Sequence, residues 1–227
     1  MASAKGLFSA ALGRFFFTNA TVTEVSELGR NLRRIDLTGP ELANARFTPG
    51  DKIQVFVMGE DMRTYTPFNW RGESASLIGF VHGEGPGSRW VKTVKAGDAV
   101  QFFGPRGSLD VGGITGNVVV IGDETSLAVA RAFSESKRVS VVLEAQQPEV
   151  TNEVCAKLGL SHADVTSRGD VDGMFDKLSA QLKAGATPYF TGRAATTQQL
   201  KQRLKAAGLS FGGKTKAYWA DGKRGLD

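Results

Sequence analysis

The strongest constraint on the fold of this 227-residue chain is a change in its hydropathy pattern near residue 110. Before that point, short runs rich in Val, Ile, Thr and Phe are separated by Gly and Pro. Beyond it, continuous β-branched runs alternate with longer segments typical of helices. Short, punctuated strands favour an antiparallel barrel or sandwich, whereas strand–helix alternation favours a parallel α/β sheet. The sequence therefore predicts two domains, residues 1–112 and 113–227.

The predicted elements follow this division. In the first half, strands are expected at residues 21–25, 31–37, 52–57, 76–81 and 98–103, with one helix at 88–94 and a further strand at or beside 63–67. In the second half, strands are expected at 117–121, 139–143 and 188–191, helices at 126–137, 150–158, 174–184 and 197–207, and a last strand at 216–219. The β-branched runs of the second half indicate strands buried on both faces.

Composition limits the chemistry. The single cysteine, Cys155, excludes an internal disulfide and any all-cysteine metal site, and two histidines leave little material for a metal centre, so no metal is expected. The net charge of +5 favours anionic ligands. The basic residues are scattered and no nucleic-acid motif is present, so nucleic-acid binding is not expected. Cys155 lies in a helical context without a base and is interpreted as a packed thiol.

No apolar stretch is long enough to cross a bilayer, so no membrane segment is expected. Residues 1–17 are interpreted as a short amphipathic helix, because Arg14 interrupts the apolar run and no cleavage site is evident. With one free cysteine, the predicted location is the cytoplasm. A monomer is expected.

Residues 208–215 match the phosphate-loop pattern G-x-x-x-x-G-K-[ST]. A phosphate loop needs a strand before it and a helix after it. Here a predicted helix precedes the motif, so we interpret the segment as a loop leading to the last strand.

The segment Arg63, Thr64, Tyr65 and Thr66 is the first candidate binding site. Arginine offers a charged fork for a phosphate, and a tyrosine two positions later lies on the same strand face and can stack on a planar ring. The Thr66 hydroxyl and amide could bond to ring heteroatoms. Read alone, the segment is equally consistent with an edge strand.

The second candidate follows the strand that ends near His82. Residues 85–88 bring small side chains, including Gly87, to the start of a helix, where free amides favour an anion. Ser88 would cap the helix or donate to a phosphate. A plain Gly-Pro turn, with His82 as a structural hydrogen-bonding residue, is the alternative.

Acidic and small residues follow the strands of the second half. Asp123, Glu124, Thr125 and Ser126 come directly after the strand at 117–121, where α/β sheets bind nucleotide phosphates. Glu144 ends the next strand and stands where an acid can hold a ribose hydroxyl. Acids are common at strand ends, so this nicotinamide-nucleotide site is the weaker hypothesis. No catalytic triad or paired-carboxylate set is present, and no catalytic side chain is predicted.

Taken in order, these segments resemble the siderophore-interacting protein family, flavin reductases of the ferredoxin-reductase-like superfamily. The resemblance covers nearly the whole chain. It is carried by residues 63–66, the stretch from His82 to Trp90, residues 122–127 and the ending 218–225.

The resemblance implies a six-stranded antiparallel Greek-key FAD-binding barrel followed by a Rossmann-like parallel α/β domain of the NAD(P)H-binding type. It implies that the enzyme uses FAD to reduce a ferric siderophore, an anionic chelate, in iron acquisition. NADH, NADPH or ferredoxin would donate the electrons and Fe(II) would be released. Carried over by position, Arg63 would hold the FAD diphosphate, Tyr65 would pack on the flavin and Thr66 would approach its reactive edge. Thr64 belongs to the same segment, His82 would line the cleft, and Gly87 and Ser88 would contact the diphosphate.

Two positions depart from the family pattern. Many members carry a second arginine where this chain has Phe68, which puts one FAD contact in doubt. The acidic loop continues Leu127-Ala128-Val129 where Leu-Pro-Ala is common. A basic C-terminal tail (Lys214, Lys216, Lys223 and Arg224) is predicted to form part of a rim that attracts the anionic chelate. The alternatives are a general NAD(P)H–flavin oxidoreductase with another acceptor, and a non-enzymatic ferric-chelate binding protein.

Overall fold

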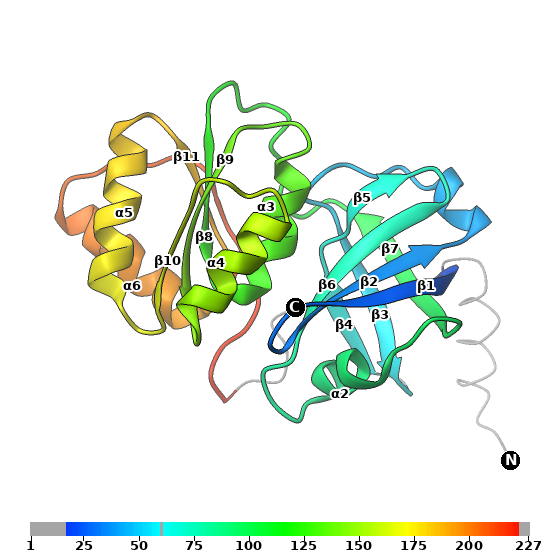
Figure 1. The fold of residues 1–227 in the computed structure, drawn as a ribbon. Helices are drawn as coiled ribbons and strands as arrows, with labels where there is room; N and C mark the ends of the chain where they lie inside the picture. The colour runs from blue at the N-terminus through cyan, green and yellow to red at the C-terminus, as the bar shows by residue number, and fades with distance from the viewer. Residues whose placement is uncertain (1–16, 60, 223–227) are drawn as a thin grey trace, which may run out of the picture.

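The computed structural model describes residues 17–59 and 61–222. The helix predicted within residues 1–17 therefore lies outside the described residues, except for Phe17, which begins the first strand. Lys223 and Arg224 lie outside them as well. The described chain forms two layered halves that lie side by side (Figure 1).

The first half is a curled antiparallel sheet of seven strands in the order β4-β3-β7-β1-β2-β6-β5. Its elements are β1 (Phe17–Gly29), β2 (Leu32–Thr38), a 3-10 helix (Pro40–Asn44), β3 (Lys52–Met58), β4 (Asp61–Tyr65), β5 (Phe68–Arg71), β6 (Ser74–Phe80), α2 (Pro86–Thr93) and β7 (Ala99–Arg106). Alternate residues of β3 are buried, and Ile53, Val55 and Val57 face the core. This period of two matches a sheet with one face inside.

The predicted antiparallel fold is confirmed, with one strand more than the six expected. The additional strand that sequence analysis missed is β5. It is short, follows Pro67, and its pairing with β6 shifts register between Phe68 and Arg71. Asn69 has a left-handed φ of 50°. Such an interrupted strand leaves no alternating pattern in the sequence.

The second half is a parallel sheet of five strands in the order β10-β9-β8-β11-β12. Its elements are β8 (Val118–Gly122), a 3-10 helix (Glu124–Ser126), α3 (Leu127–Phe133), β9 (Val139–Ala145), α4 (Pro148–Lys157), β10 (Ala163–Ser167), α5 (Val171–Lys183), β11 (Thr187–Phe190), α6 (Ala194–Ala206) and β12 (Lys214–Thr215). Every residue of β8 is buried, as expected of a central parallel strand.

Two strands of this sheet differ from the prediction. Sequence analysis missed β10, whose side chains are half-buried and include Asp164 and Thr166, so it lacks an apolar run. The last strand was predicted at 216–219 but is the two-residue β12. It lies against β11 because Gly213 has φ 102°, and a Cβ there would meet the carbonyl oxygen of Pro188 at 2.0 Å. Residues 208–215 therefore connect α6 to a strand, without the helix that a phosphate loop requires.

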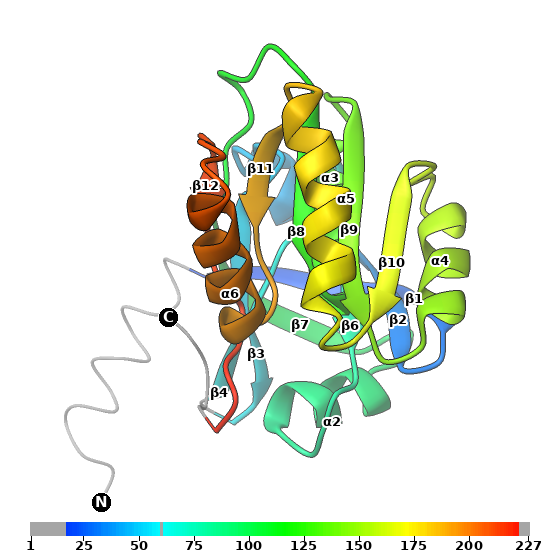
Figure 2. The same cartoon turned by 90° about the vertical axis from the view of Figure 1, so that its left-hand side faces the viewer.

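One of the three hydrophobic clusters of the described residues is shared by the two halves. Helices α3 and α4 cover the face of the parallel sheet that is turned toward the first half, while α5 and α6 cover the opposite face (Figures 1 and 2). Leu32, Phe68 and Ile78 of the first half join Leu127 and Phe133 of the second in a single buried cluster. Cys155 is packed in that cluster, as predicted. The domain boundary near residue 112 stays a prediction.

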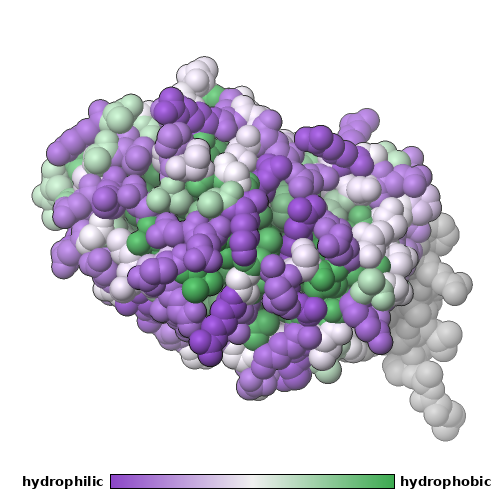
Figure 3. All heavy atoms as spheres, viewed as in Figure 1, coloured by the Kyte–Doolittle hydropathy of each residue, from purple (hydrophilic) through white to green (hydrophobic). Residues whose placement is uncertain are grey.

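Hydrophilic residues dominate the face shown in Figure 3, and the apolar patches between them are small and separate. Within residues 17–59 and 61–222, no helix has the length and apolar character needed to span a membrane.

Candidate functional site

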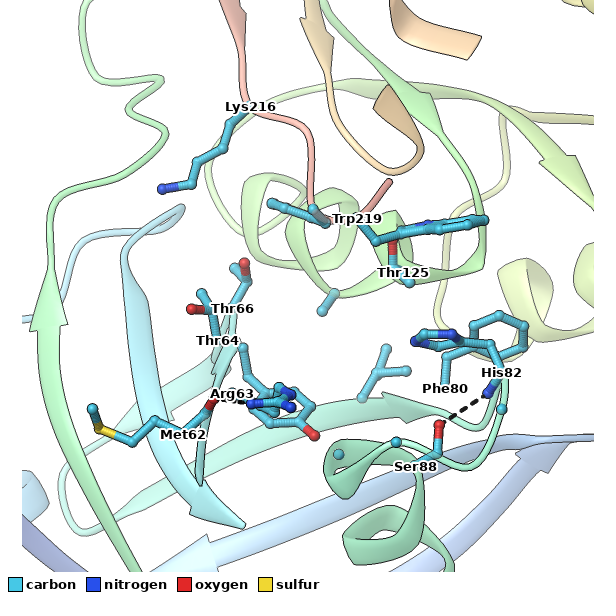
Figure 4. Close-up of a pocket in the computed structure, with 17 residues that line it drawn as sticks. Met62, Arg63, Thr64, Thr66, Phe80, His82, Ser88, Thr125, Lys216 and Trp219 are labelled. Atoms are coloured by element: carbon cyan, nitrogen blue, oxygen red, sulfur yellow. Dashed lines mark hydrogen bonds between the residues drawn. The ribbon is translucent and has the colours of Figure 1, made fainter. Parts of the chain in front are cut away.

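A cavity of about 390 Å³ lies where the two halves meet (Figure 4). Its walls come from β4, from the segment between β6 and α2, from the start of α3 and from the chain that follows β12. The predicted residues of the first half all line it: Arg63, Thr64, Tyr65, Thr66, His82, Gly87 and Ser88. The structure thus brings together two segments that are separate in the sequence.

One wall is built by β4. Arg63 and Tyr65 pair with the buried residues Val55 and Ile53 of β3, which places both side chains on the same face of the strand. The Tyr65 ring packs on Trp90 of α2, with ring centroids 5.4 Å apart. Burial raises the pKa of Tyr65 and the Arg63 charge lowers it, with burial the larger effect. Tyr65 therefore offers the cavity a neutral aromatic surface.

The Arg63 guanidinium keeps donors available at this wall. Its Nη1 donates to the carbonyl oxygen of Met62 at 2.6 Å and lies 3.6 Å from the Asp61 carboxylate. The side chain is 30% exposed. A guanidinium has five N–H donors, so most of them remain for an anion.

The start of α2 forms the wall next to β4. The helix begins at Pro86 after Gly85, and no side chain of the described residues caps it. A Cβ at Gly87 would lie 3.1 Å from Cγ of Arg63 and 3.7 Å from the Tyr65 hydroxyl, so the absence of a side chain here keeps the cavity open. The first-turn amides and the helix dipole favour an anion next to Arg63.

Ser88 is not a helix cap in this structure. Its side chain is 5% exposed, and its hydroxyl accepts a hydrogen bond from the His82 amide at 3.3 Å (Figure 4). This bond holds the segment between β6 and α2 against the helix. Ser88 retains its own hydroxyl proton for donation toward the cavity.

A row of aromatic rings closes the side nearest the second half. The rings of Phe80 and His82 are 5.6 Å apart, and those of His82 and Trp219 are 5.9 Å apart with 24° between their planes. The indole N–H of Trp219 donates to Asp123 at 2.7 Å. The guanidinium groups of Arg168 and Arg193 lie 5.6 and 5.7 Å from the indole ring.

Of the four residues predicted after β8, only Thr125 lines the cavity. The Asp123 carboxylate is fully buried and accepts from the Thr125 amide at 2.9 Å, while Ser126 Oγ accepts from the Asp123 amide at 3.2 Å. Glu124 is also buried and accepts from the Gln146 amide at 2.9 Å and from Arg168. These side chains stabilise the turn, and Asp123 also binds the Trp219 indole. They therefore affect the cavity through Trp219 and do not line it themselves.

Glu144 is fully buried at the end of β9. One carboxylate oxygen accepts from the Gly169 amide at 2.8 Å and the other from Thr196 Oγ1 at 2.6 Å. The contact of Glu144 with a ribose stays a prediction. Such a contact would compete with the two hydrogen bonds of the Glu144 carboxylate, which join α6 and the turn after β10 to the sheet.

Of the two described residues of the predicted basic rim, the structure places one at the cavity. Lys216 lines the cavity, whereas Lys214 is exposed in β12 and does not line it.

Phe68, which replaces an arginine of the family pattern, is 1% exposed in the shared core, with the guanidinium groups of Arg34 and Arg131 near its ring. Phe68 therefore does not face the cavity.

Several residues that line the cavity, including Phe80, had no role assigned from the sequence, and the two from the C-terminal segment are Tyr218 and Trp219. Their only sequence signal was their place in the ending 218–225. The Tyr218 backbone amide donates to the Gly192 carbonyl at 2.8 Å, which fixes this segment to the turn after β11. A loop of this kind is positioned by tertiary contacts, and the local pattern does not predict its contacts.

The residues present fit a flavin dinucleotide. A cationic fork lies beside an uncapped helix start that carries no side chain at Gly87, an arrangement that suits a diphosphate. Tyr65, Phe80 and Trp219 supply the apolar walls that a planar ring requires. The hydroxyl oxygen of Tyr218 is buried without a hydrogen-bonding partner among the described residues, which marks a polar group available at this site. No group of His, Cys, Asp and Glu in the described part of the chain is arranged to hold a metal ion.

Residues 58–109 match the sequence model of the siderophore-interacting FAD-binding domain. A search of curated proteins finds no match. Among solved structures, the siderophore-interacting protein SipS from Aeromonas hydrophila is 21% identical with a TM-score of 0.68, covering 92% of this chain and 93% of that one. A siderophore utilization protein from T. fusca is 20% identical with a TM-score of 0.65, covering 93% and 95%.

Phthalate dioxygenase reductase, described as transferring electrons from pyridine nucleotides to [2Fe-2S], is 17% identical with a TM-score of 0.70. The match covers 92% of this chain and 69% of that chain. These similarities extend over both halves of the molecule and include the arrangement of the curled sheet against the parallel one.

Proposed function

We propose that this chain, which combines a siderophore-interacting FAD-binding domain at residues 58–109 with a ferredoxin-reductase-like fold, is a flavin-dependent oxidoreductase that reduces ferric siderophores. The observation that carries the proposal is the single cavity lined by residues 63–66 and by Gly87 and Ser88. The alternative acceptors of a general flavin reductase remain outcomes of the test below.

In this proposal Arg63 binds the FAD diphosphate together with the amides and hydroxyl at Gly87 and Ser88. Tyr65 packs against the isoalloxazine ring, Thr66 lies at its reactive edge, and Thr64 and His82 line the cleft. Bound FAD supplies the conversion between a two-electron donor and a one-electron acceptor. The protein contributes position and electrostatics, and no side chain acts as acid or base on the iron.

The overall reaction balances without a further reactant. One NADH or NADPH gives two electrons to two Fe(III), leaving the oxidised nucleotide, one proton and two Fe(II). With ferredoxin as donor, one reduced carrier serves each Fe(III). Fe(II) is bound weakly by the chelate and is released, which would serve iron acquisition in the cytoplasm. We assign the nucleotide to the carboxyl end of the parallel sheet, where Thr125 and Trp219 face the cavity.

The anionic chelate is proposed to approach past Lys216, the basic residue of the described C-terminal segment that lines the cavity. Lys223 and Arg224 are proposed to extend this rim. A basic rim raises the encounter rate with an anionic chelate.

The decisive experiment is an anaerobic assay of purified protein with FAD, a ferric siderophore and an Fe(II) trap, run separately with NADH, NADPH and reduced ferredoxin. Fe(II) formation that depends on both FAD and a donor is expected. A flavin-containing protein that reduces quinones but no ferric chelate would indicate the general reductase. A protein that binds the chelate and no flavin would indicate a carrier.

The Arg63→Ala variant tests whether FAD binds in the cavity that Arg63 lines. Loss of charge-assisted hydrogen bonds should raise the dissociation constant for FAD by about 10- to 100-fold. Arg71→Ala is the matched control, because Arg71 is exposed at the end of β5 and does not line the cavity. Equal FAD affinity in the two variants would remove the proposed diphosphate site.

A further inference from the structure

A second cavity, of about 690 Å³, opens between α6 and residues 208–217, at the edge of the parallel sheet where β12 is the last strand. In Figure 2, α6 and β12 lie at this edge. The residues that line this groove are different from those that line the cavity between the two halves. The proposed FAD complex therefore leaves the groove unused.

One wall of the groove is a strip of α6. Thr197, Lys201 and Lys205 line it at a spacing of four residues, so they follow one another along one side of the helix. Leu200 and Leu204 are fully buried and hold the neighbouring side of α6 against the sheet. The helix thus presents its lysine side chains to the groove from a fixed position.

The other wall is apolar and is also held in place. Leu209 and Phe211 line the groove, are half-buried and pack against the hydrophobic cluster under α6. The Phe211 ring lies 5.4 Å from the ring of Phe190. The Leu209 amide donates to the Leu204 carbonyl at 2.9 Å, which ties this wall to the end of α6. The groove is therefore formed before any ligand binds.

The charges in the groove are all positive. Among the described residues that line it, two are lysines and none is Asp or Glu. Lys201 Nζ donates to Thr215 Oγ1 at 3.1 Å and so links α6 to β12. Lys205 is exposed and has no ion-pair partner among residues 17–59 and 61–222. Its ammonium group stands at the end of the groove where Leu209 is tied to α6, so a positive charge lies next to an apolar wall.

The extended segment after β12 separates the groove from the cavity between the two halves. Thr215 and Ala217 line the groove, whereas Lys216 and Tyr218 line the other cavity, as expected where side chains alternate along an extended chain. The amides of Lys216 and Tyr218 donate to carbonyl groups of β11 and of the turn after it, at 2.8 Å each. A ligand in the groove would thus contact one side of this segment without entering the proposed FAD site.

Residues 208–215, which match the phosphate-loop pattern, supply much of the groove. No helix follows them in the described chain, so they lack the first-turn amides that hold a polyphosphate. They contribute Leu209 and Phe211, which favour an apolar group. The volume lies within the range of about 300–1,000 Å³ found for small-molecule sites, whereas a stable protein partner needs about 800 Å² of surface on each side. A small amphipathic anion therefore fits better than a nucleotide or a protein.

We infer that the groove between α6 and residues 208–217 is a second binding site, which takes a small carboxylate with an apolar body. The carboxylate is held at Lys205, and the apolar body lies against Leu209 and Phe211. The site shares no lining residue with the proposed FAD site. The inference therefore stands or falls independently of ferric-siderophore reduction.

The probe is decanoate, titrated into the full chain by calorimetry with and without FAD. Saturable binding at a single site is expected in both cases, and acetate should not compete because it lacks the apolar body. Lys205→Glu should raise the dissociation constant for decanoate by about fivefold to tenfold, since it replaces an attraction by a repulsion. Gln198→Trp should abolish binding, because Gln198 is an exposed residue of α6 that lines the groove and the indole would fill it.

Lys183→Glu is the matched control. Lys183 is also an exposed helical lysine, at the end of α5, and it does not line the groove. This variant should bind decanoate like the wild type, and circular dichroism checks that all three variants are folded. The inference is overturned if decanoate does not bind, if FAD displaces it, or if both groove variants retain wild-type affinity.

Two further measurements test the other occupants of the groove. ATP that competes with decanoate would indicate a nucleotide site. A dimer that Gln198→Trp dissociates, measured by analytical ultracentrifugation, would assign the groove to a second copy of the chain. Either result would overturn the proposed carboxylate site.

Discussion

At the residue scale, the cavity depends on the lack of a side chain at Gly87 as well as on the side chains that line it. Gly87 is a helical residue with an ordinary φ, so its backbone tolerates other residues. What a side chain would disturb is the space between Arg63 and Tyr65, where the nearest atoms would lie at 3.1 and 3.7 Å. The constraint at this position thus comes from the cavity.

Gly87→Ala should therefore separate stability from binding. Alanine in a helix is favoured over glycine by about 0.5–1 kcal/mol, so the melting temperature should rise slightly. FAD affinity should fall, because the methyl group occupies the strip between the two walls. Thermal unfolding without ligand and calorimetric titration with FAD measure the two effects. Gly107→Ala, at an open position outside the cavity, serves as the control. Unchanged FAD affinity in Gly87→Ala would argue against ligand approach at this strip.

At the scale of elements, the segment after β12 is attached through Trp219. Its indole donates to the buried Asp123, whose other carboxylate oxygen caps the turn after β8. One residue therefore connects the C-terminal segment to the loop that begins α3, while its ring stacks on His82 of the first half.

Trp219→Phe keeps the ring contacts and removes the indole N–H. Leaving a buried carboxylate without one donor should cost about 1–3 kcal/mol of unfolding free energy, and loosening of the segment should weaken FAD binding. Urea unfolding and FAD titration check this. Trp70→Phe is the comparison, because the Trp70 indole donates to the Leu42 carbonyl and lies outside the cavity lining. It should lose stability only. A weaker FAD complex in Trp70→Phe as well would show that general destabilisation explains the effect.

Prediction from sequence succeeded where local patterns are strong. The buried run of β8 and the alternating pattern of β3 indicated their sheets. Residues 63–66, Gly87 and Ser88 line one cavity, and their roles toward a cofactor stay predictions. Prediction from sequence failed at β5 and β10, whose pairing depends on neighbouring strands. It also could not show that Asp123 and Glu144 are buried and bonded within the protein, because burial is a property of the assembled fold.

At the scale of the whole molecule, buried titratable groups make the fold sensitive to alkali. Burial raises the pKa of Cys155 from 9.0 to about 11, and that of Tyr218 from 10.0 to about 12. Well below pH 9 both groups are protonated whether the chain is folded or unfolded, so their contribution is fully present. Above it the unfolded chain loses these protons first, and stability falls as the pH rises.

The contribution of Cys155 to the pH dependence of the unfolding free energy can be measured separately. Between pH 9 and 10.5, Cys155 should account for a loss of about 1.5 kcal/mol in unfolding free energy. Cys155→Ala should show a shallower decline over the same interval, whatever its stability at pH 7. Urea unfolding at several pH values measures both slopes. Parallel curves for wild type and variant would contradict the assignment.

The shared core predicts how the molecule unfolds. Because Leu32, Phe68 and Ile78 pack with Leu127 and Phe133, separating the halves would expose apolar surface on both. The Asn69 amide and side chain also bond to Glu135 and Arg131 of the second half at 2.7 and 2.6 Å. The full chain should unfold in one transition, and residues 1–112 expressed alone should lack a cooperative transition in calorimetry. Two separate transitions in the full chain would show that the halves are independent.

The wall supplied by residues 216–219 is made after both sheets are complete in the chain. A chain whose synthesis stops before Lys216 would therefore contain the twelve strands of the described residues but lack this wall, and a protease that cuts behind Thr215 would remove it. Either event should leave the circular dichroism spectrum nearly unchanged while the yellow colour of a purified sample fades. Colour per milligram then becomes a simple measure of how many molecules retain an intact carboxyl end.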